Sequence, residues 1–257
     1  MSELRLMLHQ MSYDARSGIR NPPALFFGVL LPVIFLLIFA TVFGNDTIAA
    51  RGGIKTSTYY VPTIAALGII STTFVNLAIS MVVLRENRIL KRLRGTPLPM
   101  PAFLAGRISW AIALATALTV ALLVIGKLLY GVDLPGSTVP GVVIALAVGA
   151  ACFCVMGIAL SAAIPNEDSA PPMVNAVILP LYFISGVFFD VKDAPKWLND
   201  VADVFPVKHL AEALLKAFDP RTTGAGIAWG DLAVVAAWGA AGLVAALLFF
   251  RWTPKGE

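Results

Sequence analysis

Six long stretches of the chain contain no charged side chain, and this distribution of charge limits the fold more than any other feature. The stretches are residues 21–45, 56–84, 108–126, 134–166, 169–189 and 232–250. A helix needs about 20 apolar residues to cross the roughly 30 Å hydrocarbon layer of a bilayer. Lipid offers no hydrogen-bond partner to a free backbone group, so segments of this length cross as helices. The sequence therefore predicts an all-α integral membrane protein with six transmembrane helices.

Composition narrows the classes of function. Of the 257 residues, 58% are hydrophobic and 13% are charged, about half the charged share of soluble domains. The isoelectric point is basic, near 9.2, which is typical of many proteins that bind nucleic acid. The excess positive charge, however, lies beside the apolar stretches, where it fits contact with anionic lipid. We therefore expect membrane lipids, and no nucleic acid, as partners.

The catalytic motifs of common enzyme classes are missing from the sequence. It has no G-x-x-x-x-G-K-[ST] loop, no H-E-x-x-H and no G-x-S-x-G, which are motifs for ATP binding, metalloproteases and serine hydrolases. We expect no catalytic residue, no metal site and no cofactor bound by this chain.

The whole chain, 1–257, is predicted to form one transmembrane domain. Its spans are expected at 24–43, 60–84, 108–126, 140–164, 170–189 and 230–250. Before the first span, Leu4, Leu8 and Met11 recur at helical spacing with Met7 alongside. This pattern predicts an interfacial helix over 1–20 that lies in the headgroup region.

The connection at 85–107 carries the densest positive charge and sets the orientation. Six of its residues are Arg or Lys, and retained positive charge marks the cytoplasmic side. With an even number of spans, both termini are then cytoplasmic. Ile89, Leu90 and Leu93 form an apolar stripe among the charges, and Gly95 with Pro97 and Pro99 ends the pattern. We expect a short amphipathic helix here, within 85–99. Glu86 is expected to pair with Arg88, Lys91 or a cation on a partner.

The connection at 187–228 differs, because apolar and charged residues alternate at helical spacing. Two short amphipathic helices, broken at Pro206, are predicted. They are too short and too charged to span the membrane, so we expect them to dip into or lie on the outer leaflet over 190–220. The candidate residues of this outer pair are Trp197, Phe205 and His209.

Polar residues inside the apolar stretches are the candidates for a substrate pathway. No charged residue lies there, whereas carriers driven by protons or sodium ions usually keep a carboxylate or broken helices near the midplane. Interhelical hydrogen bonding is the alternative role for such uncharged polar residues. The pathway candidates are Asn76, Ser80, Asn175, Tyr182 and Ser185. Small residues at four-residue spacing, Gly141, Ala145 and Gly149, and again Gly157 and Ser161, are expected to pack spans together within one subunit.

Two of the connections resemble the signatures of one transporter family. The segment R-E-N-R-I-L-K-R-L-R-G-T-P-L-P at Arg85–Pro99 resembles the cytoplasmic signature after the second span of type-2 ATP-binding-cassette (ABC) exporter permeases. The segment P-L-Y-F-I-S-G-V-F-F at Pro180–Phe189, with P-x-W-L at Pro195–Leu198 and F-P-x-x-H-L at Phe205–Leu210, resembles the signature around the fifth span. The likeness covers nearly the whole chain and is closest to short drug- and antibiotic-export permeases. This chain departs from the family pattern at Arg88, where Gly is common, and at Asp190, where an uncharged residue is usual.

The resemblance implies a function and a set of partners. Such permeases pair as dimers in the plasma membrane, each contacts a separate ATP-binding subunit, and substrate passes between the two permeases. ATP and Mg would then bind the partner subunit, and the basic helix would be the coupling helix that docks on it. The implied coupling residues are Glu86, Arg88, Ile89, Leu90, Lys91, Leu93 and Arg94.

The sequence leaves the transported substrate open. The leading hypothesis is the permease subunit of an ATP-driven exporter of hydrophobic or amphipathic small molecules. Export of a lipid or a lipid-linked glycan is the alternative within transport. A membrane enzyme or assembly factor without transport is the alternative of another class.

Overall fold

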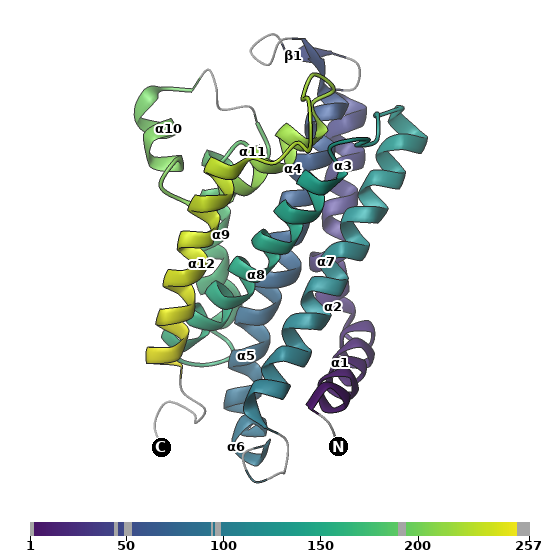
Figure 1. The fold of residues 1–257 in the computed structure, drawn as a ribbon. Coiled ribbons are helices and arrows are strands. Elements are labelled where there is room, and N and C mark those ends of the chain that lie inside the picture. The colour runs from purple at the N-terminus through teal and green to yellow at the C-terminus, as the bar shows by residue number, and fades with distance from the viewer. Residues whose placement is uncertain are drawn as a thin grey trace.

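The helices of the chain run along one long axis and form a single bundle. A computed structural model describes residues 3–43, 46–48, 53–93, 95, 99–189 and 194–250, without the side chains of residues 3–5 and 23–24. The start of α1 (Glu3–Ile19) and the end of α12 (Trp229–Phe249) lie at the same end as α6 (Ile89–Leu93), as Figure 1 shows. The hairpin of β1 (Thr47–Ile48) and β2 (Ile54–Lys55) lies at the opposite end, with α10 (Lys196–Ala202). This arrangement is the one expected of a chain that crosses a membrane an even number of times.

Four helical segments are long and apolar enough to cross a membrane. They are Thr56–Glu86, which comprises α4 (Thr56–Ile70), η3 (Ser71–Val75) and α5 (Asn76–Glu86), then α7 (Met100–Tyr130), α8 (Val139–Ala163) and α12. Two further apolar helices are shorter, namely Phe26–Val42, made of η1 (Phe26–Leu30) and α3 (Leu31–Val42), and α9 (Ala170–Ile184). The short helix α2 (Pro22–Leu25) precedes η1. These apolar helices coincide with the six charge-free stretches.

The ends of several elements differ from those expected from the sequence. The helix at the predicted third span begins at Met100 rather than at 108, because Pro99 is extended and Pro101 occupies the first turn of the helix, where proline is tolerated. The helix at the predicted fifth span ends at Ile184 rather than at 189. A 15-residue helix rises only about 22 Å, and Ser185–Phe189 continue as a turn beside it. The hairpin β1–β2 was not predicted at all.

The basic connection contains only a short helix. The helix α5 continues to Glu86, the backbone turns at Asn87 and Arg88, and α6 covers just Ile89–Leu93. Arg94, Pro97 and Asp190 lie outside the described residues. The expected helix over 85–99 is therefore divided between two helices and the turn that joins them.

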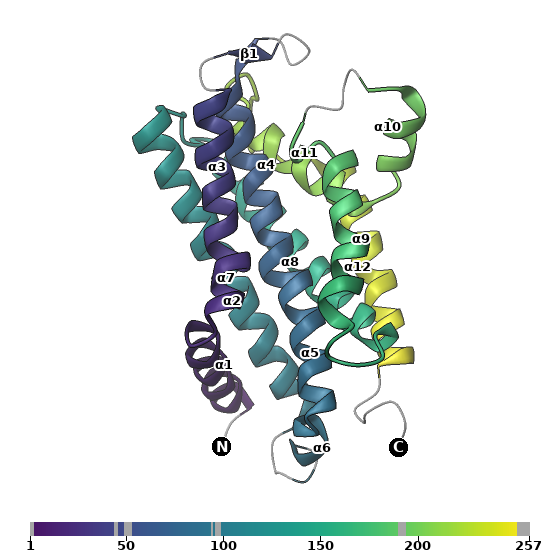
Figure 2. The same ribbon diagram turned by 180° about the vertical axis from the view of Figure 1, so that it is seen from behind.

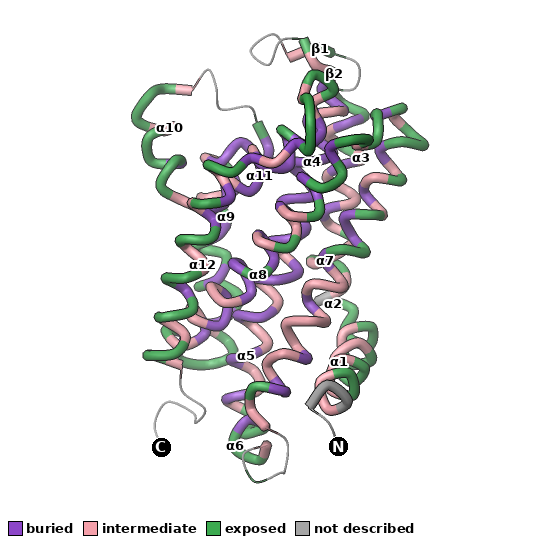
Figure 3. The backbone as a smooth tube through the Cα atoms, in the orientation of Figure 1, coloured by how far each residue is buried: buried purple, intermediate pink, exposed green. Residues whose placement is uncertain are grey.

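The helix α8 forms the centre of the bundle, and its small residues allow that position. It contacts α12, α5, α11 (Pro206–Phe218) and α7. A Cβ atom at Gly157 would lie 2.6 Å from the Phe74 carbonyl oxygen, and one at Gly149 would lie 2.6 Å from a methyl group of Leu210. Both are closer than real Cβ contacts, so Gly157 admits no side chain against the backbone of Phe74, and a side chain at Gly149 would displace the end of Leu210. The expectation that the small residues pack spans within one subunit is confirmed. Figure 3 shows buried residues concentrated in α4, α8 and α11.

The outer helices α10 and α11 have different environments. The helix α11 contacts α4, α8 and α12 and buries Leu210, Leu214 and Phe218, so it lies inside the bundle. The helix α10 contacts α9 and leaves Trp197 65% exposed. Of the two predicted amphipathic helices, α11 therefore packs its apolar face on three helices of the bundle, and the position of the pair at the outer leaflet stays a prediction.

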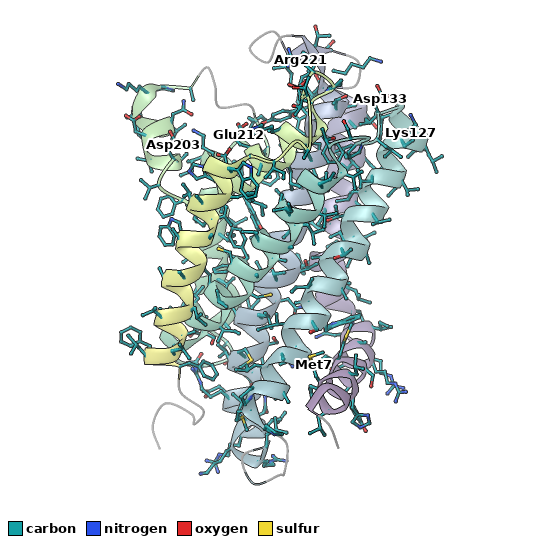
Figure 4. The ribbon with its side chains drawn as sticks, in the orientation of Figure 1. Met7, Lys127, Asp133, Asp203, Glu212 and Arg221 are labelled. Carbon is teal, nitrogen blue, oxygen red and sulfur yellow. The ribbon has the colours of Figure 1, made fainter. Side chains whose placement is uncertain are left out.

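The helix α1 packs along α7, and its predicted apolar face is divided between that contact and the outside. Met7, Met11 and Asp14 are partly buried, whereas Leu8 is 53% exposed; the Leu4 side chain lies outside the described part. Figure 4 shows Met7 between α1 and the inner half of α7. Gly106 permits this packing, because a Cβ there would lie 2.8 Å from Gln10. The close approach of the two backbones fixes which face of α1 meets α7, and the interfacial position of α1 stays a prediction.

Candidate functional site

The junction between α5 and α6 is fastened to the other spans by a buried arginine. The Arg85 side chain is 0% exposed. Its two terminal nitrogens donate hydrogen bonds to the carbonyl oxygens of Ser161, at 2.9 Å, and Ile164, at 2.6 Å. These carbonyls belong to the C-terminal end of α8, where helix carbonyls lack intrahelical partners and the helix dipole is negative. The guanidinium of Arg85 therefore caps α8 from the end of α5.

Two further contacts fix the same junction. The Nε of Arg85 lies 3.3 Å from a carboxylate oxygen of Glu86, so Glu86 pairs with its own neighbour, a residue outside the expected set. The side-chain amide of Asn87 donates to a Glu167 carboxylate oxygen at 3.1 Å, in the turn between α8 and α9. The junction is thus joined to both helices that follow α7.

The apolar stripe of α6 is divided between the interior and the surface. Leu90 is 0% exposed and packs with Met81, Phe103 and Ile158, and Leu93 packs against the same cluster. Ile89 is 37% exposed. Leu90 and Leu93 therefore hold α6 to the bundle of this chain, and Ile89 is the apolar residue that α6 presents outward. The coupling role assigned to these residues stays a prediction.

Arg88 has a backbone conformation that is unusual for its residue type. Its φ is 57°, and it is the non-glycine residue with positive φ among those described. Left-handed backbone costs about 1–2 kcal/mol for a residue with a Cβ and nothing extra for glycine. The glycine common at this position in the resembled family matches this geometry, so the cation at Arg88 is placed there at a conformational cost.

The five pathway candidates do not gather at one place. Asn76 and Ser80 line a pocket beside α1, with Arg107. Tyr182 is buried, and its hydroxyl lies 3.2 Å from that of Ser71. Ser185 is also buried, and Asn175 is exposed on α9. The structure thus gives Tyr182 the interhelical hydrogen bond that was the alternative to substrate contact.

An aromatic cluster in the outer half of the bundle joins the first, second and fifth apolar helices. The Phe188 ring lies 5.4 Å from Phe35, 5.9 Å from Phe39 and 6.2 Å from Tyr182, between ring centroids. Below it, the hydroxyls of Tyr59 and Tyr60 donate to backbone carbonyls after α9. The acceptors are the carbonyls of Gly186 and Phe188, the latter at 3.1 Å.

Sequence reasoning missed this cluster, although a signal was present. Phe35, Phe39 and Phe43 recur every fourth residue, so their rings share one face of the first span. Polarity, by which the pathway candidates are chosen, does not single out these rings. An uncharged protein interior that carries apolar molecules would be lined by aromatic surface instead.

At the outer end, His209 connects the corner between α10 and α11 to the start of α12. Its Nδ1 lies 2.7 Å from the Asp231 carboxylate, and its Nε2 lies 2.9 Å from the backbone carbonyl of Asp203. Both partners are acceptors, so only the doubly protonated imidazolium donates to both. The hydrogen bond with Asp231 raises the pKa of His209, against the effect of partial burial.

Charges and aromatic rings surround this histidine. Lys208 lies 2.7 Å from the Asp203 carboxylate, and Phe205 stacks on Trp238 of α12 with centroids 5.9 Å apart. The Trp238 indole N–H donates to the Val204 carbonyl at 2.7 Å. Figure 4 places Asp203 and Glu212 at this outer end. His209 and Phe205 thus stabilise the corner, while Trp197 projects away from it.

Comparison with known proteins identifies related sequences. The family described as ABC-2 type transporter matches residues 11–218. The Daunorubicin resistance ABC transporter permease protein DrrB1 of Streptomyces coeruleorubidus is 28% identical over 196 residues, which cover 72% of this chain and 65% of that protein. The Inner membrane transport permease YadH of Escherichia coli K12 is 22% identical over 190 residues, 73% of each chain. The match therefore spans less than two thirds of the Streptomyces relative.

Replacing Arg88 with glycine should stabilise the protein. The change removes a left-handed backbone strain and should raise stability by about 1 kcal/mol, or about 2–4 °C in melting temperature for a chain of this size. Thermal unfolding of the detergent-solubilised protein measures this. Lys91→Gly, inside α6, is the control and should lower stability by about 1 kcal/mol. A lower melting temperature for Arg88→Gly would show that the arginine side chain contributes more than its backbone costs.

The contact of His209 with Asp231 and the Asp203 carbonyl should contribute more to the stability of the protein at low pH than at high pH. The folded-state pKa of His209 is raised above its ordinary value of 6.5. Its contribution is therefore fully present below about pH 6.5 and is lost as pH rises through the folded-state pKa. The melting temperature should fall between pH 6 and pH 9, and His209→Gln should remove most of this fall. His9→Gln, at the other histidine of the chain, should keep it. An unchanged pH profile in His209→Gln would contradict the assignment.

Proposed function

The chain belongs to the ABC-2 type transporter family as a non-catalytic membrane permease subunit, and we propose that it exports hydrophobic or amphipathic small molecules. The energy comes from ATP hydrolysed with Mg on a separate ATP-binding subunit, the partner that this family implies. The observation that carries the proposal is the fastening of α6 to α8 and α9 through Arg85 and Asn87. A short helix so fastened transmits the movement of a docked subunit to the spans.

In this mechanism, movement applied at α6 travels through α9 to the outer end. Arg85 and Asn87 connect α6 to the start of α9, and the residues after α9 are hydrogen bonded to Tyr59 and Tyr60 of α4. Packed, hydrogen-bonded elements move as units rather than deform. A tilt of α9 driven by the ATP-binding subunit would then rearrange the aromatic cluster, which separates the outer side from the pathway.

The substrate class is proposed from the chemistry of that cluster and from one relative. The described interior there is aromatic and uncharged, which suits flat or apolar molecules better than ions. The Streptomyces relative is named for daunorubicin resistance. A lipid or lipid-linked glycan would meet the same surfaces and is the competing substrate class.

We propose that the six apolar helices cross the plasma membrane as six spans. In this orientation α6 and both ends of the chain lie in the cytoplasm. The basic density of residues 85–107 supports that orientation. The arrangement in Figure 1, with the start of α1 and the end of α12 at the same end of the bundle as α6, agrees with it.

A second copy of the permease is proposed to pack against α3 and α9. These helices flank α4 on the face shown in Figure 2. They expose large apolar side chains, among them Val42 at 68%, Leu179 at 46% and Phe183 at 56%. The substrate would pass between the two copies, close to the aromatic cluster.

Substitution of Ile89 by aspartate should separate docking from folding. Ile89 is the outward apolar residue of α6, so a charge there should weaken binding of the ATP-binding subunit by about tenfold or more and leave the bundle intact. Co-purification with that subunit and thermal unfolding measure the two effects. Asn166→Asp is the control, because it adds the same charge in the exposed α8–α9 turn at the same end. Normal co-purification of Ile89→Asp would remove α6 from the docking surface.

Transport itself is tested with the permease and its ATP-binding subunit in inside-out vesicles. Daunorubicin is the first probe, and a fluorescent phospholipid is the second. ATP should drive accumulation of daunorubicin and stimulate ATP hydrolysis, and Ile89→Asp should abolish both. Accumulation of the phospholipid alone would reject the small-molecule proposal in favour of lipid export. If ATP drove the accumulation of neither daunorubicin nor the phospholipid, the proposed export of these two substrate classes would be rejected.

A further inference from the structure

We propose that the pocket between α1, α5 and α7 binds the headgroup of a phospholipid with a primary ammonium group, such as phosphatidylethanolamine, from the cytoplasmic leaflet. The pocket has a volume of about 100 Å³ and opens beside Ser17 and Asn21. Its inner wall carries Asp14 and Arg107. None of the aromatic rings of the proposed transport pathway lines it, whereas Asn76 and Ser80, two of the pathway candidates from the sequence, do.

The pocket contains one positive and one negative charge in direct contact. An Arg107 terminal nitrogen donates to an Asp14 carboxylate oxygen at 2.9 Å, and the other terminal nitrogen donates to the Ser80 hydroxyl at 2.7 Å. A guanidinium has five N–H donors, and these bonds use two of them. The second oxygen of Asp14 accepts from Gln10 at 3.2 Å and retains lone pairs for a further donor. The site can therefore offer donors to a phosphate and an acceptor to an ammonium.

This charge pair selects the kind of headgroup. A purely anionic headgroup would add a negative charge to a pocket in which Arg107 already pairs with Asp14. A choline headgroup has no N–H to donate. A phosphoethanolamine headgroup can place its phosphate at Arg107 and its ammonium at Asp14, so that both charges of the pocket gain an opposite partner.

The pocket also lies at the depth of lipid headgroups. The helix α7 has 31 residues and is about 46 Å long, about 16 Å longer than the hydrocarbon layer. Arg107, about 10 Å from the inner end of α7 by helical rise, is then close to the boundary between headgroups and hydrocarbon. Trp110 lines the same pocket, and tryptophan is enriched at this boundary.

An apolar path for the acyl chains continues from the polar part. Leu25 and Leu114 line the pocket on the side toward the membrane centre. Beyond them Phe26 is 41% and Phe27 is 62% exposed at the start of the first span. A lipid bound here would touch α1 and three spans at once, and would tie the interfacial helix to the bundle.

The test measures lipid binding by the purified, delipidated full-length permease in mild detergent. Dioctanoyl forms of phosphatidylethanolamine, phosphatidylglycerol and phosphatidylcholine are titrated and bound lipid is counted by native mass spectrometry. Wild type should bind phosphatidylethanolamine about tenfold more tightly than either of the others. Arg107→Gln should lose about tenfold in that affinity, and Asp14→Asn should shift the preference to phosphatidylglycerol. Arg16→Gln, an exposed arginine of α1 outside the pocket lining, should bind as wild type does.

A second pair of variants tests the proposal even if Arg107→Gln detaches α1 from α7. Ser17→Phe closes the mouth of the pocket and leaves the Arg107–Asp14 contact intact, and Ser12→Phe places the same ring on exposed surface outside the pocket lining. Only Ser17→Phe should lose binding. Equal binding by wild type and Ser17→Phe, or a wild-type preference for phosphatidylglycerol, overturns the proposal. Equal competition by soluble glycerophosphoethanolamine or inorganic phosphate would assign the pocket to a free anion and overturn the lipid.

Discussion

The buried guanidinium of Arg85 is the interaction on which the inner half of the molecule depends. A full charge with no exposed surface is tolerated only when its donors are satisfied, since an uncompensated buried charge costs about 3–5 kcal/mol. Here the C-terminal carbonyls of α8 and the Glu86 carboxylate provide that compensation. The same bonds satisfy a helix end that would otherwise present free carbonyls inside the protein. The buried guanidinium and the buried helix carbonyls therefore satisfy each other. Their hydrogen bonds fix the junction of α5 and α6 against α8.

The outer half is held by a different chemistry. Two tyrosine hydroxyls of α4 donate to carbonyls in the turn after α9, and a set of aromatic rings fills the space between α3, α4 and that turn. The turn contains Gly186 with φ of 75°, a conformation suited to glycine. It bends the backbone so that Phe188 points inward. The turn before α9 is hydrogen bonded to Asn87, and the turn after α9 is held by Tyr59, Tyr60 and the aromatic rings. This attachment at both ends supports the proposal that α9 transmits movement between them.

The sequence predicted the apolar helices well, because charge exclusion is a property of each segment alone. A cluster of basic residues and a proline are also local features, so the sequence predicted the basic connection and the break at Pro206 as well. It did not predict where Arg85 lies, since a basic residue at the end of an apolar run looks like part of a charged loop. The useful signal was its spacing from Ala78 and Met81, which places it on the buried face of the helix. Arg107 was misplaced similarly: it belongs inside α7, because Pro99 and Pro101 start that helix early.

The surroundings of the pathway candidates show how polar side chains are used inside apolar helices, while their role in a pathway stays a prediction. In hydrocarbon a hydroxyl or amide gains from almost any partner, so most polar side chains in spans are used for packing. Thr72 and Thr73 donate to carbonyls one turn earlier in their own helix, at 2.7 and 2.6 Å, and Tyr182 joins Ser71. Those carbonyls lie beside η3, whose π-helical turn faces η1 across the bundle. π-Helical turns are rare and occur frequently at functional sites. The hydroxyls of Thr72 and Thr73 bond to carbonyls of the turn that precedes η3, and the aromatic rings stay our proposed surface for an apolar substrate.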